Sequence, residues 1–186
     1  MDLVARAYSV AEGRLASSLP RRWAHVQGVA KRAGLAAGVI AEAERELLTA
    51  AAVLHDVGYA PEIAETGFHP LDGARYLEDQ GCSERLCALV AHHSCAYREA
   101  ELRGYSAELA RWVDEETPLR DALWWADMTT GPYGDTTGVR ERIAEIQARY
   151  GLEDLVTVFI RQAEPELVAA VERTEARLRA AGVEVR

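Results

Sequence analysis

The sequence predicts an all-α fold, and its composition and its patterning both lead to that class. Ala, Leu, Glu and Arg dominate the chain, and runs of alternating β-branched residues, which are typical of strands, are missing. Apolar residues recur at spacings of three and four, most clearly over residues 47–55. With 186 residues, of which 49% are hydrophobic, the chain can form one domain with a sizeable core. We therefore expect a single-domain helical bundle over residues 1–186.

The first three helices are expected over residues 2–17, 21–36 and 42–56. Pro20 precedes the second of them, in the position where the first turn of a helix tolerates proline. Gly58 follows the third, and a glycine just beyond the last periodic residue commonly ends a helix. These signals define an N-terminal group of three helices.

A loop over residues 59–70, which contains two prolines and a glycine, separates this group from the next helices. A helix is expected over residues 71–80, ended by Gly81. Ser83 then supplies an N-cap for a helix that continues to about Ser94.

The second half of the chain is also expected to be helical. Residues 98–112 are weakly patterned, and Gly104 is expected to break them. Pro118 begins a helix that reaches Asp127 or Met128, and a turn-rich loop, TTGPYGDTTG, follows it. Three further helices are expected over residues 139–150, 153–162 and 164–181. They either cover the core or form the face of a homodimer.

The charge of the chain limits its partners. There are 21 Lys and Arg against 30 Asp and Glu, which gives a formal net charge of -9. An acidic surface repels phosphate backbones, so no nucleic-acid polymer is expected as a partner. A small phosphorylated substrate remains compatible with this charge, because a few cationic groups in a cleft can outweigh the overall sign.

Nothing in the sequence indicates export or a membrane partner. The first residues mix charges into every turn, and no apolar run approaches the roughly 18 residues of a membrane span. Three cysteines without CxxC spacing disfavour both paired disulfides and a thiolate zinc site. We therefore expect a cytoplasmic protein.

The chemistry is indicated by the histidines, of which there are only five, all in the first half of the chain. His55 and Asp56 stand together at the end of an apolar helix, and burying both groups costs several kcal/mol unless a partner satisfies them. A divalent cation is one such partner, because imidazole nitrogen and carboxylate oxygen suit several metals. A helix-terminal histidine followed by a capping aspartate is the simpler interpretation of the same dipeptide. His25 and Asp127 favour the cation, since both lie on apolar helices and should point inward.

In this order and in these contexts the sequence resembles the HD superfamily of metal-dependent phosphohydrolases. The matching segments are RRWAHVQGVAKRAG with His25, AAAVLHDVGY with His55 and Asp56, and LWWADMTTG with Asp127. The resemblance covers roughly residues 20–130 and implies an all-α fold of the HD type. We expect residues 131–186 to be C-terminal helices that pack on this motif core. The resemblance also implies that these four residues hold a metal ion.

A second layer of the resemblance suggests a second ion. Some HD subfamilies carry further histidines between the His-Asp pair and the last Asp, and His69 in HPLDGARYL and His92 in ALVAHHSCA match those positions. An aspartate would then bridge the two ions, and His93 would be a ligand, an acid or a substrate contact. The ligand types do not distinguish Mn, Fe, Zn, Ni, Co and Mg. The structural alternative makes His69 a loop residue and one of the pair a solvated helix residue.

The implied activity is hydrolysis of a phosphate ester or anhydride of a small molecule, a nucleotide being the expected class. Asp56, His92 and His93 are the candidate catalytic residues, because a metal-activated water and a titratable histidine would carry the reaction. Three further residues are the candidates for binding the substrate: Arg22, Arg75 and Thr130. Each also has a simpler interpretation, as an ordinary surface arginine, a helix arginine and a turn hydroxyl, respectively.

Two other functions use a similar set of residues. HD-type oxygenases bind two irons with four histidines and two aspartates, a set that the same positions can supply. A non-catalytic nucleotide sensor is the second alternative. The segment SCAYREAEL after the double histidine differs from the GYP-type segment of cyclic-di-GMP phosphodiesterases, so that activity is not expected.

Overall fold

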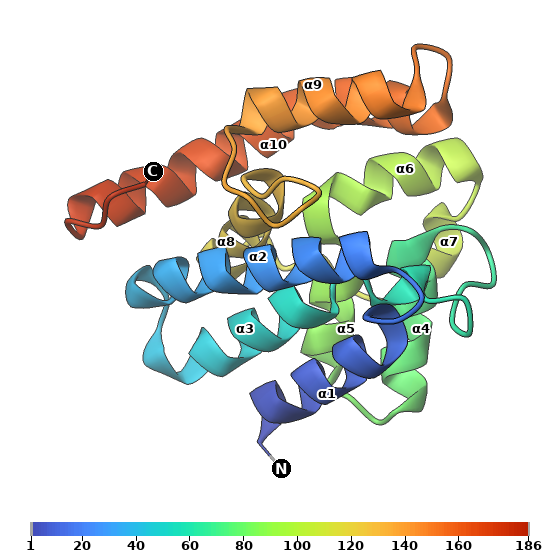
Figure 1. Cartoon of the computed structure of the whole chain (residues 1–186), viewed down its shortest axis with the longest axis horizontal. Helices are drawn as coiled ribbons and strands as arrows, with labels where there is room; N and C mark the ends of the chain where they lie inside the picture. The colour runs from blue at the N-terminus through green and yellow to red at the C-terminus, as the bar shows by residue number, and fades with distance from the viewer. Residues whose placement is uncertain (1, 186) are drawn as a thin grey trace.

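The computed structural model describes residues 2–185, and within that range the chain is all-α, as predicted, without a named strand (Figure 1). Four short 3-10 turns, η1 to η4, join the α-helices. The bounds of the helices are α1 Leu3–Leu15, α2 Pro20–Ala36, α3 Arg45–Leu54, α4 His69–Asp79, α5 Glu84–Ala91, α6 Ala96–Arg103, α7 Ser106–Leu109, α8 Pro118–Met128, α9 Val139–Tyr150 and α10 Leu155–Ala180, and those of the 3-10 turns are η1 Ala37–Val39, η2 Glu42–Glu44, η3 Val57–Tyr59 and η4 His93–Cys95.

Local signals explain where several helices begin. Pro20 is the first residue of α2, and the Ser83 hydroxyl accepts a hydrogen bond from the Leu86 amide at the start of α5. Thr117 caps α8 in the same way, through the Arg120 amide. The expected break at Gly104 is also present, because this glycine adopts a φ of 78° between α6 and α7.

The expectation of two separate helices over residues 153–162 and 164–181 is wrong, because α10 is continuous and carries Pro165 inside it. A proline removes one backbone hydrogen bond and crowds the preceding turn, but it does not have to end a helix that packing holds in place. Here Ala163 and Leu167, on either side of the proline, are fully buried.

The helix expected over residues 83–94 ends earlier than predicted, at Ala91. Ser94 and Cys95 then adopt left-handed φ values of 48° and 62°, which are uncommon for residues other than glycine. These two residues turn the chain sharply into α6. The turn decides which of the neighbouring histidines faces the interior.

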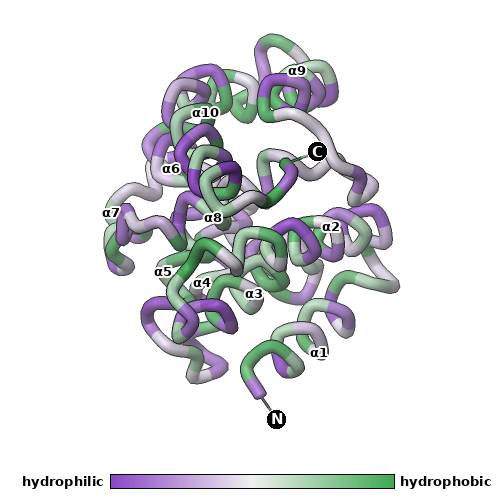
Figure 2. Tube along the Cα trace, turned by 90° about the vertical axis from the view of Figure 1, so that its left-hand side faces the viewer, coloured by the Kyte–Doolittle hydropathy of each residue, from purple (hydrophilic) through white to green (hydrophobic). Residues whose placement is uncertain are grey.

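The helices pack in two groups around α8. In Figure 1, α2 and α3 run side by side with α1 against α3, while α9 and α10 cross the opposite side of the molecule and α10 packs along α8. Hydrophobic residues dominate the central α3 and α5 in Figure 2, whereas α9 and α10 alternate between hydrophilic and hydrophobic positions. Both Trp124 and Trp125 of α8 are buried in the core. No helix in residues 2–185 has the length and apolar character needed to cross a membrane.

Two glycines allow loops to approach the helices closely. A Cβ on Gly58 would lie 2.0 Å from the carbonyl oxygen of His69, so only glycine lets η3 contact the start of α4. A Cβ on Gly28 would lie 2.6 Å from the Cα of Gly134, so glycine also lets the loop over residues 129–138 lie on α2. Gly58 thus serves close packing, where the sequence suggested a helix stop.

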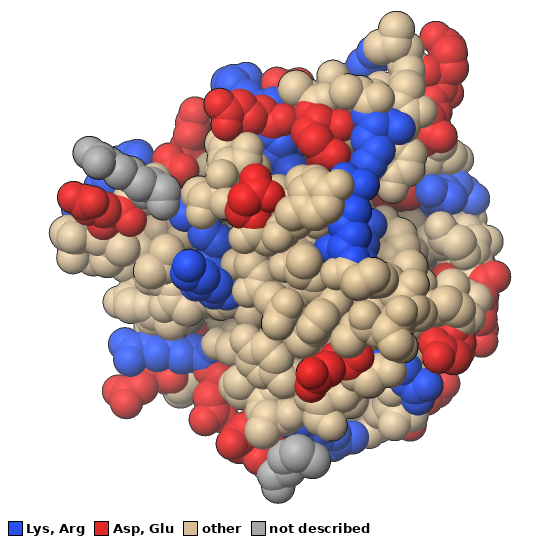
Figure 3. Space-filling view, viewed as in Figure 1, with Lys and Arg blue, Asp and Glu red and all other residues tan. Residues whose placement is uncertain are grey.

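The surface carries both signs of charge. In Figure 3 acidic and basic side chains are dispersed over most of the face, but a band of basic side chains runs from α9 toward the start of α2.

Candidate metal centre

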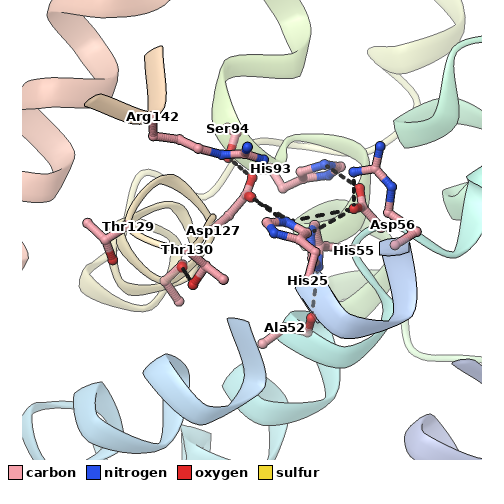
Figure 4. A network of polar contacts seen from close by, with 12 residues as sticks. His25, Ala52, His55, Asp56, His93, Ser94, Asp127, Thr129, Thr130 and Arg142 are labelled. Atoms are coloured by element: carbon pink, nitrogen blue, oxygen red, sulfur yellow. Dashed lines mark hydrogen bonds and ion pairs between the residues drawn. The ribbon is translucent and has the colours of Figure 1, made fainter. Parts of the chain in front are cut away.

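Three helices bring the predicted His and Asp residues to one buried point (Figure 4). His25 lies within α2, His55 and Asp56 follow the end of α3, and Asp127 lies in the last turn of α8. His25 Nε2 is 3.1 Å from Asp127 Oδ1, and His55 Nε2 is 3.4 Å from Asp56 Oδ2. All four residues are less than 10% exposed.

Backbone carbonyls fix the orientation of three imidazoles in the cluster. The Nδ1–H of His25 donates to the Gly131 carbonyl at 3.0 Å, and that of His55 donates to the Ala52 carbonyl at 2.8 Å. The Nδ1–H of His93 donates to the Val90 carbonyl at 2.6 Å. Because Nδ1 carries the proton in each ring, the Nε2 lone pair of each neutral imidazole points into the cluster. This is the arrangement by which proteins commonly orient histidine ligands of metals.

The inward Nε2 atoms face carboxylate oxygens, and both kinds of atom carry lone pairs. His55 Nε2 is fully buried and has no hydrogen-bond partner within residues 2–185. Such a contact is repulsive unless a proton or a cation lies between the atoms. Ligand atoms of His25, His55 and Asp56 lie within 4.8 Å of one another, so a divalent cation fits this position. Asp127 borders the same position through its contact with His25.

The other oxygen of Asp56 faces a second group. Asp56 Oδ1 lies 3.3 Å from His69 Nε2 and 4.0 Å from His93 Nε2, and the two Nε2 atoms are 3.1 Å apart. These three residues also have ligand atoms within 4.8 Å of one another. Asp56 therefore stands between two potential cation positions, with one oxygen turned to each.

His93, rather than His92, joins this second group, which corrects the ligand expected from the sequence. His92 Nε2 is 2.7 Å from the carbonyl oxygen of Trp112, and the indole N–H of Trp124 donates to the His92 carbonyl at 3.0 Å. His92 is thus a packing residue between α5 and α8, without a ligand or catalytic position. The helix ends one turn before the expected residue, and the following turn directs His93 inward.

The electrostatics of the cluster follow from its burial and its carboxylates. Burial disfavours the charged form of His55, but Asp56 and Asp127 outweigh it and raise the pKa of His55 to about 9. Burial also opposes ionisation of Asp56, yet Arg22 and His55 hold its pKa well below the usual range. Burial lowers the pKa of both His69 and His93. Both histidines of the second group are therefore neutral at pH 7, which is the form of imidazole that binds metals.

Part of the cluster lines a cavity of about 300 Å³, namely Asp56, His69, His93 and Asp127. Arg22 reaches it as expected: its Nη1 donates to Asp56 Oδ2 at 2.7 Å, and its guanidinium lies 4.0 Å from the centre of the Tyr59 ring. Tyr59 in turn stacks on His69, with ring centres 3.9 Å apart. This stack holds an arginine beside the two potential cation positions, where it can contact a phosphate oxygen.

Two of the predicted substrate contacts lie elsewhere. Arg75 lines a separate surface cavity beside Asp72 and Glu78, because the spacing from His69 turns it to the outer face of α4. Thr130 is fully buried, and its hydroxyl donates to the Ala126 carbonyl at 2.7 Å, so it packs against α2 and cannot reach a substrate.

The structure adds residues that the sequence reasoning missed. The Ser94 hydroxyl donates to Asp127 Oδ2 at 2.5 Å and lines the cavity. The C-terminal helices close the cavity over the cluster, with cationic and aromatic side chains from α9 and apolar ones from α10. Arg142 and Arg149 lie seven residues apart, a spacing that places both on one face of a helix and that could have indicated their shared direction. Their lining partners are Ile146, Tyr150, Val156, Phe159 and Ile160.

Comparison with known proteins identifies the family. The family model described as HD domain matches residues 22–127, which is more than half of the chain and ends on Asp127. No curated protein and no solved structure shows significant similarity to the chain. Domains of this kind are generally hydrolases that bind divalent metals, and the His and Asp cluster described above can hold such a metal. The protein belongs to the HD domain family.

Proposed function

We propose that the protein is a metal-dependent phosphohydrolase that cleaves a phosphate ester or anhydride of a small molecule. One observation carries the proposal. Three histidines that are fixed through Nδ1 turn their Nε2 atoms toward the carboxylates of Asp56 and Asp127, and both carboxylates line a cavity that also holds Arg22. Such a cluster is suited to cations, and such a cavity is suited to an anionic substrate.

The residues have distinct roles in the proposed reaction. When bound, divalent cations supply a water of lowered pKa and neutralise charge on the phosphoryl oxygens. Arg22 binds an oxygen of the phosphate and keeps it beside Asp56. Asp56 and His93 would hold the cations that activate this water, and the proton of the attacking water passes to solvent in the cavity. The water oxygen bonds to phosphorus, the bond from phosphorus to the leaving oxygen breaks, and that oxygen takes up a proton from solvent.

A nucleotide is the substrate class that the cavity favours. Its walls combine arginines with Tyr150 and Phe159, which provide aromatic surface for a base. The volume of about 300 Å³ lies at the lower end of the range for small-molecule sites. The formal charge of -9 opposes a polymer with a phosphate backbone.

The test is elemental analysis of the purified protein followed by a phosphate-release screen over nucleotides and phosphomonoesters with manganese added. We expect one or two metal ions per chain and release of phosphate, following the two-metal arrangement. Asp56→Ala should abolish metal binding and turnover while the helical circular dichroism persists. Full activity in that variant would overturn the proposal.

An HD-type di-iron oxygenase is the second candidate, because the cluster combines four histidines with two aspartates: His25, His55, His69, His93, Asp56 and Asp127. Iron near two per chain with oxygen uptake and no phosphate release would favour it. Tight nucleotide binding without turnover would favour a sensor. The first screen together with measurements of oxygen uptake and nucleotide binding therefore separates all three functions.

A further inference from the structure

A second cavity of about 330 Å³ lies on the other side of Arg22. Three arginines, Arg22, Arg142 and Arg149, line both cavities, and His25 also borders the second one. The second cavity is therefore a continuation of the metal-centre cleft that passes between α9 and the start of α2. In Figure 3 the band of basic side chains lies over the same two elements.

Arg142 is the best evidence that this region is built for a ligand. Its side chain is only 5% exposed, and its Nε is buried without a hydrogen-bond partner in the part of the chain that the structure describes. Figure 4 shows that it extends from α9 toward Ser94 and Asp127. A buried guanidinium with an unused donor costs free energy, and an anion in the cleft would satisfy it.

The charges around Arg142 are unbalanced. Glu145 is the carboxylate shared by three arginines, with distances of 2.5 Å to Arg142, 3.6 Å to Arg149 and 3.8 Å to Arg21. The single negative charge of Glu145 therefore offsets only part of the positive charge of the three arginines. The start of α2 lies beside them without a side-chain cap, so the positive end of this 17-residue helix adds to the same field.

We propose that Arg21, Arg142 and Arg149 form a second anion subsite that binds a further phosphate group of the substrate. This inference rests on the proposed hydrolase and narrows its substrate to compounds with at least two linked phosphates. Arg22 and Arg142 border both cavities, so a diphosphate can lie with one phosphate at the metal centre and the next among these arginines. A phosphomonoester would leave the second subsite empty.

The experiment compares the binding of methylenediphosphonate and methylphosphonate to the manganese-loaded full-length protein by calorimetry. We expect Arg149→Gln and Arg142→Gln each to weaken diphosphonate binding roughly ten-fold or more, since each removes a charge-assisted hydrogen bond. The monophosphonate should lose much less. Glu145→Gln should act in the opposite direction and strengthen diphosphonate binding, because it removes the carboxylate that competes for the three arginines.

Arg140→Gln is the matched control, because Arg140 lies on the same helix, is exposed and pairs with Glu164. It should leave both affinities unchanged. Arg149 is partly exposed, so its variant should fold even if loss of the buried Arg142 disturbs the helix. Unchanged diphosphonate affinity in Arg149→Gln together with no gain in Glu145→Gln would overturn the subsite. Release of phosphate from monoesters without any preference for the diphosphonate would reject the subsite and leave the hydrolase standing. Arginine-dependent diphosphonate binding without turnover would support the subsite and reject the proposed hydrolase.

Discussion

Asp56 connects the two halves of the candidate metal centre, because its two oxygens face different sets of histidines. Oδ2 lies near His55 and Arg22, and Oδ1 lies near His69. The inward direction of the His93 side chain depends on the two residues that follow it, Ser94 and Cys95, which adopt left-handed conformations. The expectation of His92 as a ligand went with a helix that continued to about Ser94, whereas α5 ends at Ala91. Helical periodicity therefore could not decide between His92 and His93 as the ligand, because a left-handed turn made by residues other than glycine gives no clear signal in the sequence.

The second cation position leads to a prediction about stoichiometry. His69→Ala and His93→Ala should each lower bound metal from about two to about one per chain, following the two-metal arrangement. Each change removes one of the three ligands in the group with Asp56. The measurement is elemental analysis of dialysed protein.

His92→Gln is the control for these variants, since His92 Nε2 contacts the Trp112 carbonyl outside the cluster. It should retain both ions. If it lost one ion while His93→Ala kept two, the assignment of the ligands would have to be reversed.

At the scale of elements, glycine contacts decide how closely the loops approach the helices that carry the ligands. The carbonyl of His69 lies against Gly58, so the approach of η3 to α4 places the imidazole of His69 beside Asp56. The sequence contained this glycine, but its local pattern indicated a helix stop. Close approach is a relation between two elements, and only their packing reveals it.

Gly58→Ala should lower the free energy of unfolding by about 3 kcal/mol, because its Cβ would overlap backbone atoms that cannot move freely. It should also weaken binding of the second metal through displacement of His69. Chemical denaturation and metal titration measure the two effects.

Gly13→Ala is the comparison, since a Cβ at that position of α1 meets nothing within 4 Å. That change should stabilise the protein by about 0.5–1 kcal/mol through helix propensity. Equal stability of the two variants would contradict the close-approach role of Gly58.

At the scale of the whole molecule, ion pairs attach the C-terminal helix to the helix that carries Asp127. Asp121 of α8 is buried and accepts hydrogen bonds from Arg173 at 2.7 and 2.8 Å and from Arg177 at 3.4 Å, both on α10. Burial opposes ionisation of Asp121, but Arg173 outweighs it and lowers the pKa of the carboxyl. α10 in turn packs on α9, so this contact holds the wall of the cleft in place.

Asp121→Asn should lower the free energy of unfolding by about 2 kcal/mol at pH 7, because it removes the buried carboxylate that pairs with Arg173 and Arg177. The loss is limited because both arginines remain partly solvated. The pKa of Asp121 is lower in the folded state than in the unfolded state. Its stabilising contribution is therefore present above about pH 4, the unfolded value, and is lost as the pH falls below it. The difference between wild type and variant should shrink below pH 4 in denaturation curves.

Arg140→Gln removes an exposed ion pair between α9 and α10 and should change stability by less than about 1 kcal/mol. An Asp121→Asn difference that persisted undiminished at pH 2 would show that the ion pairs are not its cause.

The sequence by itself determined the all-α class and the residues that gather in the cluster with Asp56: His25, His55, His69 and Asp127. It could do so because helical periodicity is local and because these polar groups stand on apolar helices, where burial leaves them few alternatives. Only the tertiary structure decided that His93 replaces His92, that Arg75 and Thr130 face away, and that α9 brings Arg142 and Arg149 to the cleft. Those outcomes depend on a left-handed turn and on contacts between helices far apart in the chain. The hydrophobic periodicity of a single segment predicts neither of them.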